Sequence, residues 1–141
     1  MTSYQINLIR LSWAKVSEMD TVLVGNLFYG KIFEIAPEAR QLFSKPIPEQ
    51  SKKVFAMLNY VISKLDHLED IIGEIEKLAK HHTTYGVKEE HYAVVGDALL
   101  WTLEKGLGED WNDELKGAWA DCYSTLATAM INAAEYRADA A

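Results

Sequence analysis

The stretch 68-LEDIIGEIEKLAKHHTTYGV-87 carries the pattern on which the fold prediction depends. Its apolar residues recur at helical spacing and mark one buried stripe: Leu68, Ile71, Ile72, Ile75, Leu78 and Ala79. One further turn brings this stripe to His82, whereas His81 continues the polar row of Glu74 and Lys77. Gly86 offers a stop for the helix. The pattern therefore predicts that His82 points inward, either as a core histidine with a satisfied hydrogen bond or as a metal ligand.

Length and composition favour a soluble helical protein formed by one domain spanning residues 1–141. Apolar residues make up 49% of the chain, which excludes a disordered class. The net charge of −7 argues against a nucleic-acid partner, because such proteins need a basic face. A single cysteine, Cys122, permits no internal disulfide. The sequence contains no secretory signal and no run long enough to span a membrane, so we expect a cytoplasmic protein without a membrane partner.

Three helical segments are predicted in the first third of the chain. A capping box of Thr2 and Gln5 opens the first, whose expected inward residues are Ile6, Ile9, Leu11, Trp13 and Val16. Asp20 can cap the second, which carries Val22, Gly25, Tyr29, Ile32 and Phe33 on one face. Because glycine weakens a helix interior, Gly25 predicts the close approach of another helix. Pro37 opens a short third segment that brings Leu42 and Phe43 to the core.

The rest of the chain predicts further helices separated by clear breaks. Pro48 starts one with the inward stripe Gln50, Val54, Met57, Leu58, Val61, Ile62 and Leu65, and 66–67 separates it from the stretch quoted above. Another runs from about residue 88 to 106. Asp110 can cap the last, with Leu115, Trp119, Cys122, Tyr123, Leu126 and Met130 inside. The tail, 133–141, is expected to fray or to begin a linker. Six or seven helices around one core is the resulting prediction.

Three polar residues fall on inward faces of different predicted helices: Tyr29, Gln50 and His82. Burying each without a partner would cost roughly 1 to 3 kcal/mol, so something polar should lie among them. They can bond to one another or to backbone carbonyls. A flat, largely apolar iron cofactor would also satisfy them, with His82 on the iron and the other two on the open side.

The chain resembles a globin, of the bacterial single-domain type related to the haem domain of flavohaemoglobins and to the single-domain globins of thermoacidophilic methanotrophs. The resemblance covers residue 8 to about 132. It rests on the segments LFYGKIFEIAPEARQLF, PEQSKKVFAML, EKLAKHHTTYGVKEEHYAVVGDALL and AWADCYSTLA. It implies an all-α globin fold of six to eight helices around haem b.

The resemblance also assigns individual roles around that cofactor. His82 would bind the iron, Phe43 would stack on the haem face and Val54 would lie beside a bound gas. Lys53 would meet a haem propionate, although a solvated lysine is an equally good reading. The same resemblance places Tyr85, Val87 and Tyr92 at the cofactor, with Tyr92 matching a tyrosine that is hydrogen-bonded to the proximal histidine. The position of the carboxylate that accompanies this tyrosine in flavohaemoglobins holds Ala134, and Glu135 one residue later would point about 100° away.

The functional expectation is tight, slowly released dioxygen, since Tyr29 and Gln50 can donate hydrogen bonds to it. Slow release suits storage or chemistry better than rapid transport. The chemistry that the resemblance implies is nitric oxide detoxification, in which O2 and NO give nitrate. CO would be a further ligand, and an external reductase would supply the electron, because no glycine-rich nucleotide motif is present. Two alternatives stay open: a haem-based sensor module of a longer protein, and a haem-free helical domain whose polar residues bond to one another.

Overall fold

The computed structural model describes residues 1–43, 45–71, 73–77 and 88–140, with side chains described as far as residue 132. The elements are α1 (Ser3–Ser17), α2 (Thr21–Ile35), η1 (Pro37–Leu42), α3 (Ile47–Ser63), η2 (Leu68–Ile71), α5 (Glu89–Leu107), η3 (Gly108–Asp110) and α6 (Asp113–Ala140). Residues 73–77 are also helical. The described residues contain no strand, and the predicted all-α class is confirmed.

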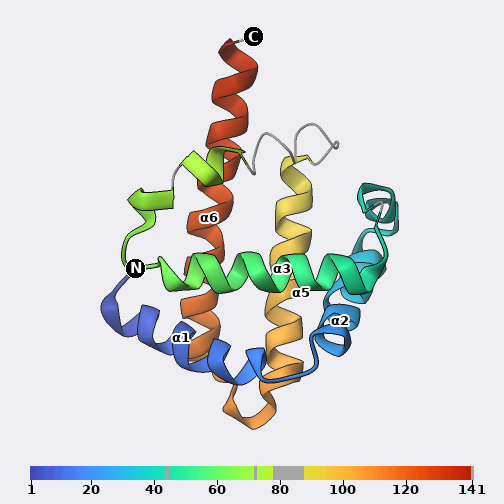
Figure 1. Cartoon of the computed structure of the whole chain (residues 1–141), viewed down its shortest axis with the longest axis vertical. Coiled ribbons are helices and arrows are strands. Elements are labelled where there is room, and N and C mark those ends of the chain that lie inside the picture. Colours follow the sequence, from blue (N-terminus) through green and yellow to red (C-terminus); the bar gives the residue numbers. More distant parts are fainter. Residues whose placement is uncertain (44, 72, 78–87, 141) are drawn as a thin grey trace.

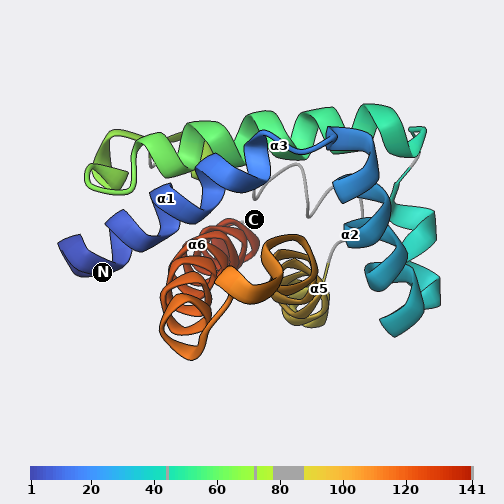
Figure 2. The ribbon, with the colours of Figure 1, turned by 90° about the horizontal axis from the view of Figure 1, so that it is seen from below.

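The helices form two layers that cross each other. Figure 1 shows α3 running across α5 and α6, and the view in Figure 2 shows α1 and α3 together on one side of that pair. At one end of the layers, α2 packs against both α3 and α5. Among the described residues, no helix is both long and apolar enough to cross a membrane. The position of α2 makes it the link between the two layers.

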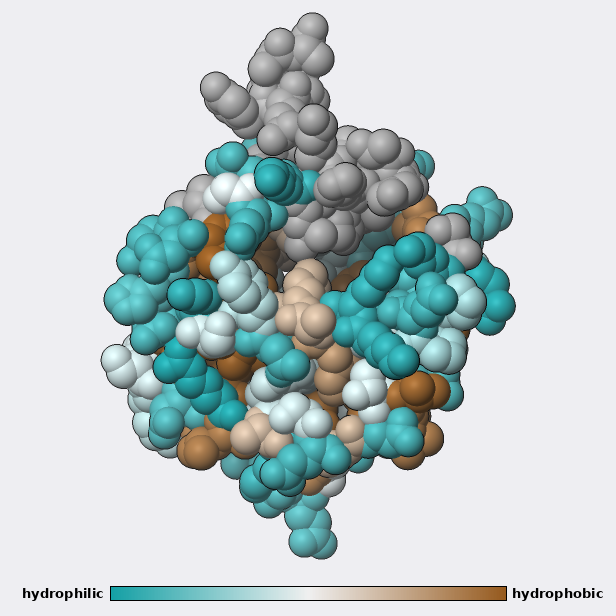
Figure 3. Space-filling view, viewed as in Figure 1, coloured by the Kyte–Doolittle hydropathy of each residue, from teal (hydrophilic) through white to brown (hydrophobic). Residues whose placement is uncertain are grey.

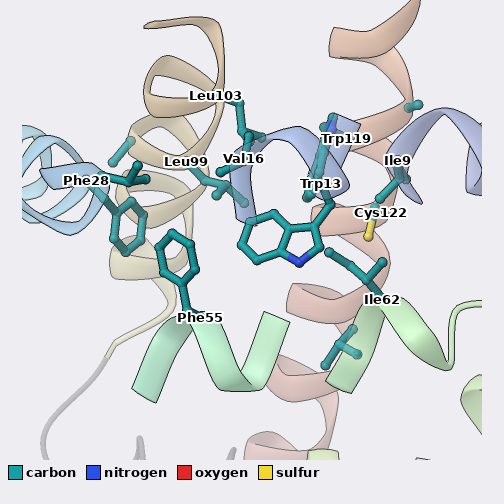
Figure 4. Packing of buried hydrophobic residues seen from close by; sticks show 14 of the residues in the cluster. Ile9, Trp13, Val16, Phe28, Phe55, Ile62, Leu99, Leu103, Trp119 and Cys122 are labelled. Carbon is teal, nitrogen blue, oxygen red and sulfur yellow. The ribbon is translucent and has the colours of Figure 1, made fainter. Parts of the chain in front are cut away.

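Aromatic side chains fill the core between these layers, as Figure 4 shows. The rings of Trp13 and Phe55 lie 5.2 Å apart, and those of Trp13 and Trp119 lie 6.2 Å apart. Both indole N–H groups have partners, because Trp119 donates to the Ser12 hydroxyl at 2.9 Å and Trp13 donates to Asn59. The core therefore buries large apolar rings without leaving their polar atoms unpaired.

Helix caps explain where several elements begin. The capping box of Thr2 and Gln5 is present, and the Asp20 side chain accepts the backbone N–H groups of Val22 and Leu23. The prediction for the last helix was wrong by two residues. Asn112 caps α6 by accepting the N–H of Leu115, because Asp110 is the last residue of η3 and an extended Trp111 follows it.

The structure corrects three further expectations, two about burial and one about the end of the last helix. Leu11, predicted to face inward, is 58% exposed, because it is two residues, or about 200° of helix, from both Ile9 and Trp13. Ser51 and Phe55 are buried although they were not assigned to the inward stripe of α3. The tail does not fray at residue 133, since α6 continues to Ala140.

For residues 68–87, which carry the pattern behind the fold prediction, the structure describes only 68–71 and 73–77. Ile71 is buried, Leu68 and Ile75 are half-buried, and the polar row of Glu74 and Lys77 is exposed, as the pattern predicts. The expected single helix is instead a 3-10 turn at 68–71 followed by a helical segment at 73–77. Residues 78–87 lie outside the described part of the chain.

The close contact between α2 and α3 is made at Gly25. A Cβ atom placed on Gly25 would lie 1.7 Å from Oγ and 2.4 Å from Cβ of Ser51, so only glycine allows this approach. The predicted reason for a glycine in this helix is therefore confirmed. Ser51 is itself fully buried at the contact.

Replacing Gly25 by Ala should destabilise the protein by about 1 to 3 kcal/mol, because overpacking outweighs the better helix propensity of alanine. The matched control is Gly30→Ala on the same helix, where a Cβ meets nothing within 4 Å and stability should rise by roughly 0.5 to 1 kcal/mol. Urea unfolding measures both. Equal effects of the two substitutions would show that the Gly25 contact does not limit the approach of α3.

Candidate functional site

The candidate site is built where α2 crosses the first turns of α3. Tyr29 lies one turn after Gly25 on the same face of α2, and Gln50 directly precedes Ser51. The Gly25–Ser51 contact thus brings Tyr29 to the start of α3. Its side chain is only 4% exposed, and its hydroxyl donates a hydrogen bond to the backbone carbonyl of Gln50 at 3.3 Å.

Aromatic rings surround Tyr29 on α2 and beyond the end of η1. Its ring centroid lies 5.0 Å from that of Phe28, 5.2 Å from that of Phe43 and 6.4 Å from that of Phe33. Phe33 and Phe43 also meet edge to face at 5.8 Å. Burial in this cluster raises the pKa of Tyr29 to about 12, since the apolar surroundings disfavour the phenolate. The shift therefore extends the pH range over which the phenol keeps its proton, and its capacity to donate, above the ordinary value of 10.0.

The predicted residues of α3 differ in burial. Gln50 and Val54 are half-buried, and Lys53 is exposed. The pKa of Lys53 is lowered by a hydrogen-bond contact with Lys45, whose charge is of the same sign. Phe43 is half-buried and sits in the aromatic cluster. The structure thus brings Tyr29, Phe43 and the backbone of Gln50 together, and places Val54 one turn further along α3.

Tyr92, on the first turn of α5, is held by Tyr123 of α6, which was predicted only as a core residue. The Tyr123 hydroxyl donates to the Tyr92 carbonyl at 2.5 Å. A Cβ atom placed on Gly96 would lie only 2.7 Å from Cε2 of the Tyr123 ring. Tyr92 is half-buried, and burial raises its pKa. Gly96 is the signal that was available in the sequence, since a glycine inside a helix indicates a close neighbour.

Three predicted site residues lie outside the described part of the chain: His82, Tyr85 and Val87. Their assigned roles stay predictions. Among the residues that the structure describes, no group of three or more His, Cys, Asp or Glu side chains could hold a metal ion.

The described side of the site fits a flat, mostly apolar cofactor. Half-buried apolar residues pack on the core from the segment after η1, from α3 and from α5: Phe43, Val54, Leu58, Val95 and Leu100. The Phe43 ring also meets the ring of Tyr29, whose buried phenol donates to the Gln50 carbonyl. Apolar side chains beside a buried polar donor suit a porphyrin that carries a small polar ligand.

Comparison with known proteins decides the family. The globin family model matches residues 26–130. The chain belongs to the globin family. That segment includes α2 from residue 26 on, all of α3 and α5 and most of α6, and thus Tyr29, Phe43, Gln50 and Tyr92 of the candidate site. Membership implies haem binding.

Named relatives of this globin include plant and bacterial proteins. It is 34% identical to an anaerobic nitrite reductase of Gossypium hirsutum, over 92% of this chain and 88% of the relative. It is 36% identical to the flavohemoprotein of Bordetella pertussis over 74% of this chain, but that match spans only 27% of the relative. A solved bacterial globin from Campylobacter jejuni superimposes with a TM-score of 0.84 at 27% identity, covering 98% and 99% of the two chains.

The raised pKa of Tyr29 predicts a specific alkaline destabilisation of this globin. The unfolded chain ionises tyrosine near the ordinary value of 10.0, while the folded chain holds the proton to about 12, so stability is lost as pH rises through this window. Between pH 9 and 11 the wild type should lose about 1.4 kcal/mol through this residue, and Tyr29→Phe should not. Urea unfolding at the two pH values measures the difference.

The control is Tyr4→Phe. A hydrogen bond to Glu114 also raises the pKa of Tyr4, but Tyr4 is 59% exposed and solvent screens this contact, so its loss should relieve far less of the alkaline destabilisation. If Tyr29→Phe and wild type lose the same stability between these pH values, the Tyr29 hydroxyl is not withheld from solvent.

Proposed function

We propose that this globin binds dioxygen tightly and releases it slowly at a haem b held by His82, with Tyr29 and Gln50 as the hydrogen-bond donors. The observation that carries the proposal is the position of the Tyr29 hydroxyl: buried, protonated and 3.3 Å from the backbone of Gln50. The haem iron would supply the binding position and the electron density that makes the outer oxygen a good hydrogen-bond acceptor.

Tyr29 can change acceptor at little cost. Its present bond to the Gln50 carbonyl is long for a hydroxyl donor, and inside α3 the same carbonyl is also the regular acceptor of the Val54 N–H. Rotation about the phenol C–O bond would redirect the proton toward a ligand without moving the ring. A charge-assisted hydrogen bond to dioxygen contributes about 1.5 to 3 kcal/mol, mostly as slower dissociation.

Nitric oxide detoxification is the proposed use of the retained dioxygen. The overall change is O2 + NO + one electron to nitrate, and the electron would come from an external reductase. Tyr29 and Gln50 would hold dioxygen in place for attack by NO, while the rings of Phe33 and Phe43 exclude water. The name of the Bordetella relative, a flavohemoprotein, supports a coupling to flavin-supplied electrons, and the cotton relative's name supports nitrogen oxide chemistry.

Replacing Tyr29 by Phe should accelerate dioxygen dissociation at least tenfold, because loss of one charge-assisted bond removes about 1.4 kcal/mol or more. Stopped-flow replacement of O2 by CO measures the rate. Tyr60→Phe is the control, since Tyr60 is 43% exposed on α3 and should leave the rate within about twofold. An unchanged rate in Tyr29→Phe would remove Tyr29 as the principal donor.

Replacing Gln50 by Leu tests the second donor. Dissociation should accelerate, and the double variant with Tyr29→Phe should lose less than the sum of the two effects if the groups act as one network. Gln41→Leu, at an exposed position of η1, is the control. Strict additivity would show two independent donors, and no effect of Gln50→Leu would leave Tyr29 alone at the ligand.

A further inference from the structure

Four exposed cationic side chains occur between η1 and the second turn of α3: Arg40, Lys45, Lys52 and Lys53. We refer to these four residues as the basic surface. Within 40–53 the only carboxylate is Glu49, so this segment has a net charge of +3, although the whole chain has −7. Figure 3 shows hydrophilic side chains gathered over the end of α3 that meets α2.

Ion pairing separates the basic surface from other cations in the described part of the chain. Other cations form ion pairs, such as Lys15 with Asp110 at 3.1 Å and Arg10 with Asp66 at 3.0 Å. None of the four has a carboxylate within salt-bridge distance in the described part of the chain. Lys45 contacts Lys53 instead, and this like-charge contact lowers the pKa of Lys53. Because opposite charges attract, an anionic surface placed over the four side chains would be drawn to them and would offset their mutual repulsion.

The basic surface is also directly connected to the candidate site. The Arg40 guanidinium lies 4.8 Å from the ring of Phe33, which packs against Phe43 and Tyr29. Lys53 directly precedes Val54 on α3. A partner that covers these cations would therefore lie over the outer side of the aromatic cluster.

We propose that the basic surface is the docking site of an acidic one-electron carrier protein. This inference rests on the proposed function, whose cycle consumes one electron per nitrate formed. The carrier would lose one electron, which returns the ferric haem to the ferrous state, and no covalent bond would form or break.

Two charge features favour a protein over a small anion. The four cations are all exposed and come from η1, α3 and the link between them, as in a surface patch rather than an enclosed anion site. In addition, residues 66–76 carry five carboxylates and no Lys or Arg, so the chain has strong charge asymmetry. Such asymmetry orients an acidic partner toward the basic surface during encounter.

Binding of an oxidised, acidic plant-type [2Fe–2S] ferredoxin to the haem-loaded protein tests the proposal without any turnover. By isothermal titration at low salt, Lys45→Glu/Lys52→Glu should weaken binding by roughly tenfold or more, and the difference should shrink to a few-fold at about 0.5 M salt. The control is Lys105→Glu/Lys116→Glu, which makes the same change in net charge at exposed positions of α5 and α6. It should change the affinity less than about threefold.

A second readout is the rate at which reduced ferredoxin reduces the ferric protein, trapped with CO and free of O2 and NO. Below saturation this rate should fall by the same factor as the affinity. Equal weakening by the two double variants would mean that net charge alone acts, and absence of wild-type binding would also overturn the proposal. If Lys45→Glu/Lys52→Glu loses haem while its loaded fraction binds ferredoxin normally, the lysines serve the cofactor carboxylates and the docking proposal is wrong.

These outcomes are separate from those of the proposed function. Ferredoxin binding and ferric reduction need neither Tyr29 nor dioxygen, so rapid O2 release would contradict the proposed function and leave the docking result unaffected. Conversely, a protein with slow O2 release and no charge-dependent ferredoxin binding would retain the function and exclude this docking surface.

Discussion

The contact between Gly25 and Ser51 is the constraint on which the candidate site depends. It sets how closely α2 approaches α3, and Tyr29 and Gln50 lie within one turn of it. Since helix interfaces are packed at the density of organic crystals, one added methyl group here cannot be absorbed without moving a backbone. The reach of the Tyr29 hydroxyl is thus determined by a residue with no side chain of its own.

Ser51 makes this contact with an incomplete set of hydrogen bonds. Its Oγ is buried and has no partner among the described residues, an arrangement that costs about 1 to 3 kcal/mol. A serine at this position therefore contributes to the approach of the two helices through its small size rather than through its hydroxyl. The stability of the crossing comes from the surrounding rings and aliphatic side chains, which the core cluster extends without interruption from α1 to α6.

Much of this arrangement could be predicted from the sequence, for identifiable physical reasons. The Thr2–Gln5 box and the Asp20 cap depend on neighbouring residues, so local pattern found them, and the interior glycine at 25 indicated a close helix. The errors have different causes. Asp110 ends η3, so α6 begins two residues later than the cap pattern suggested. Phe55 has the helical spacing of the inward stripe, three residues before Leu58 and seven before Ile62, but was not assigned to it, and it packs on Trp13. Tyr123 was assigned only to the core because its hydrogen bond to Tyr92 joins residues 31 positions apart, which a local pattern does not reveal.

Ligand retention and folding place opposite requirements on the Tyr29 hydroxyl, and its surroundings meet both. Tight ligand retention needs a donor withdrawn from water, and the Phe28, Phe33 and Phe43 rings withdraw the phenol, as its raised pKa reflects. A buried donor must nevertheless have an acceptor when no ligand is present, or its desolvation destabilises the fold. The Gln50 carbonyl fills that role with a long bond that a better acceptor can replace. Because this internal bond is weak, little of the energy of a hydrogen bond to a ligand would be lost in breaking it.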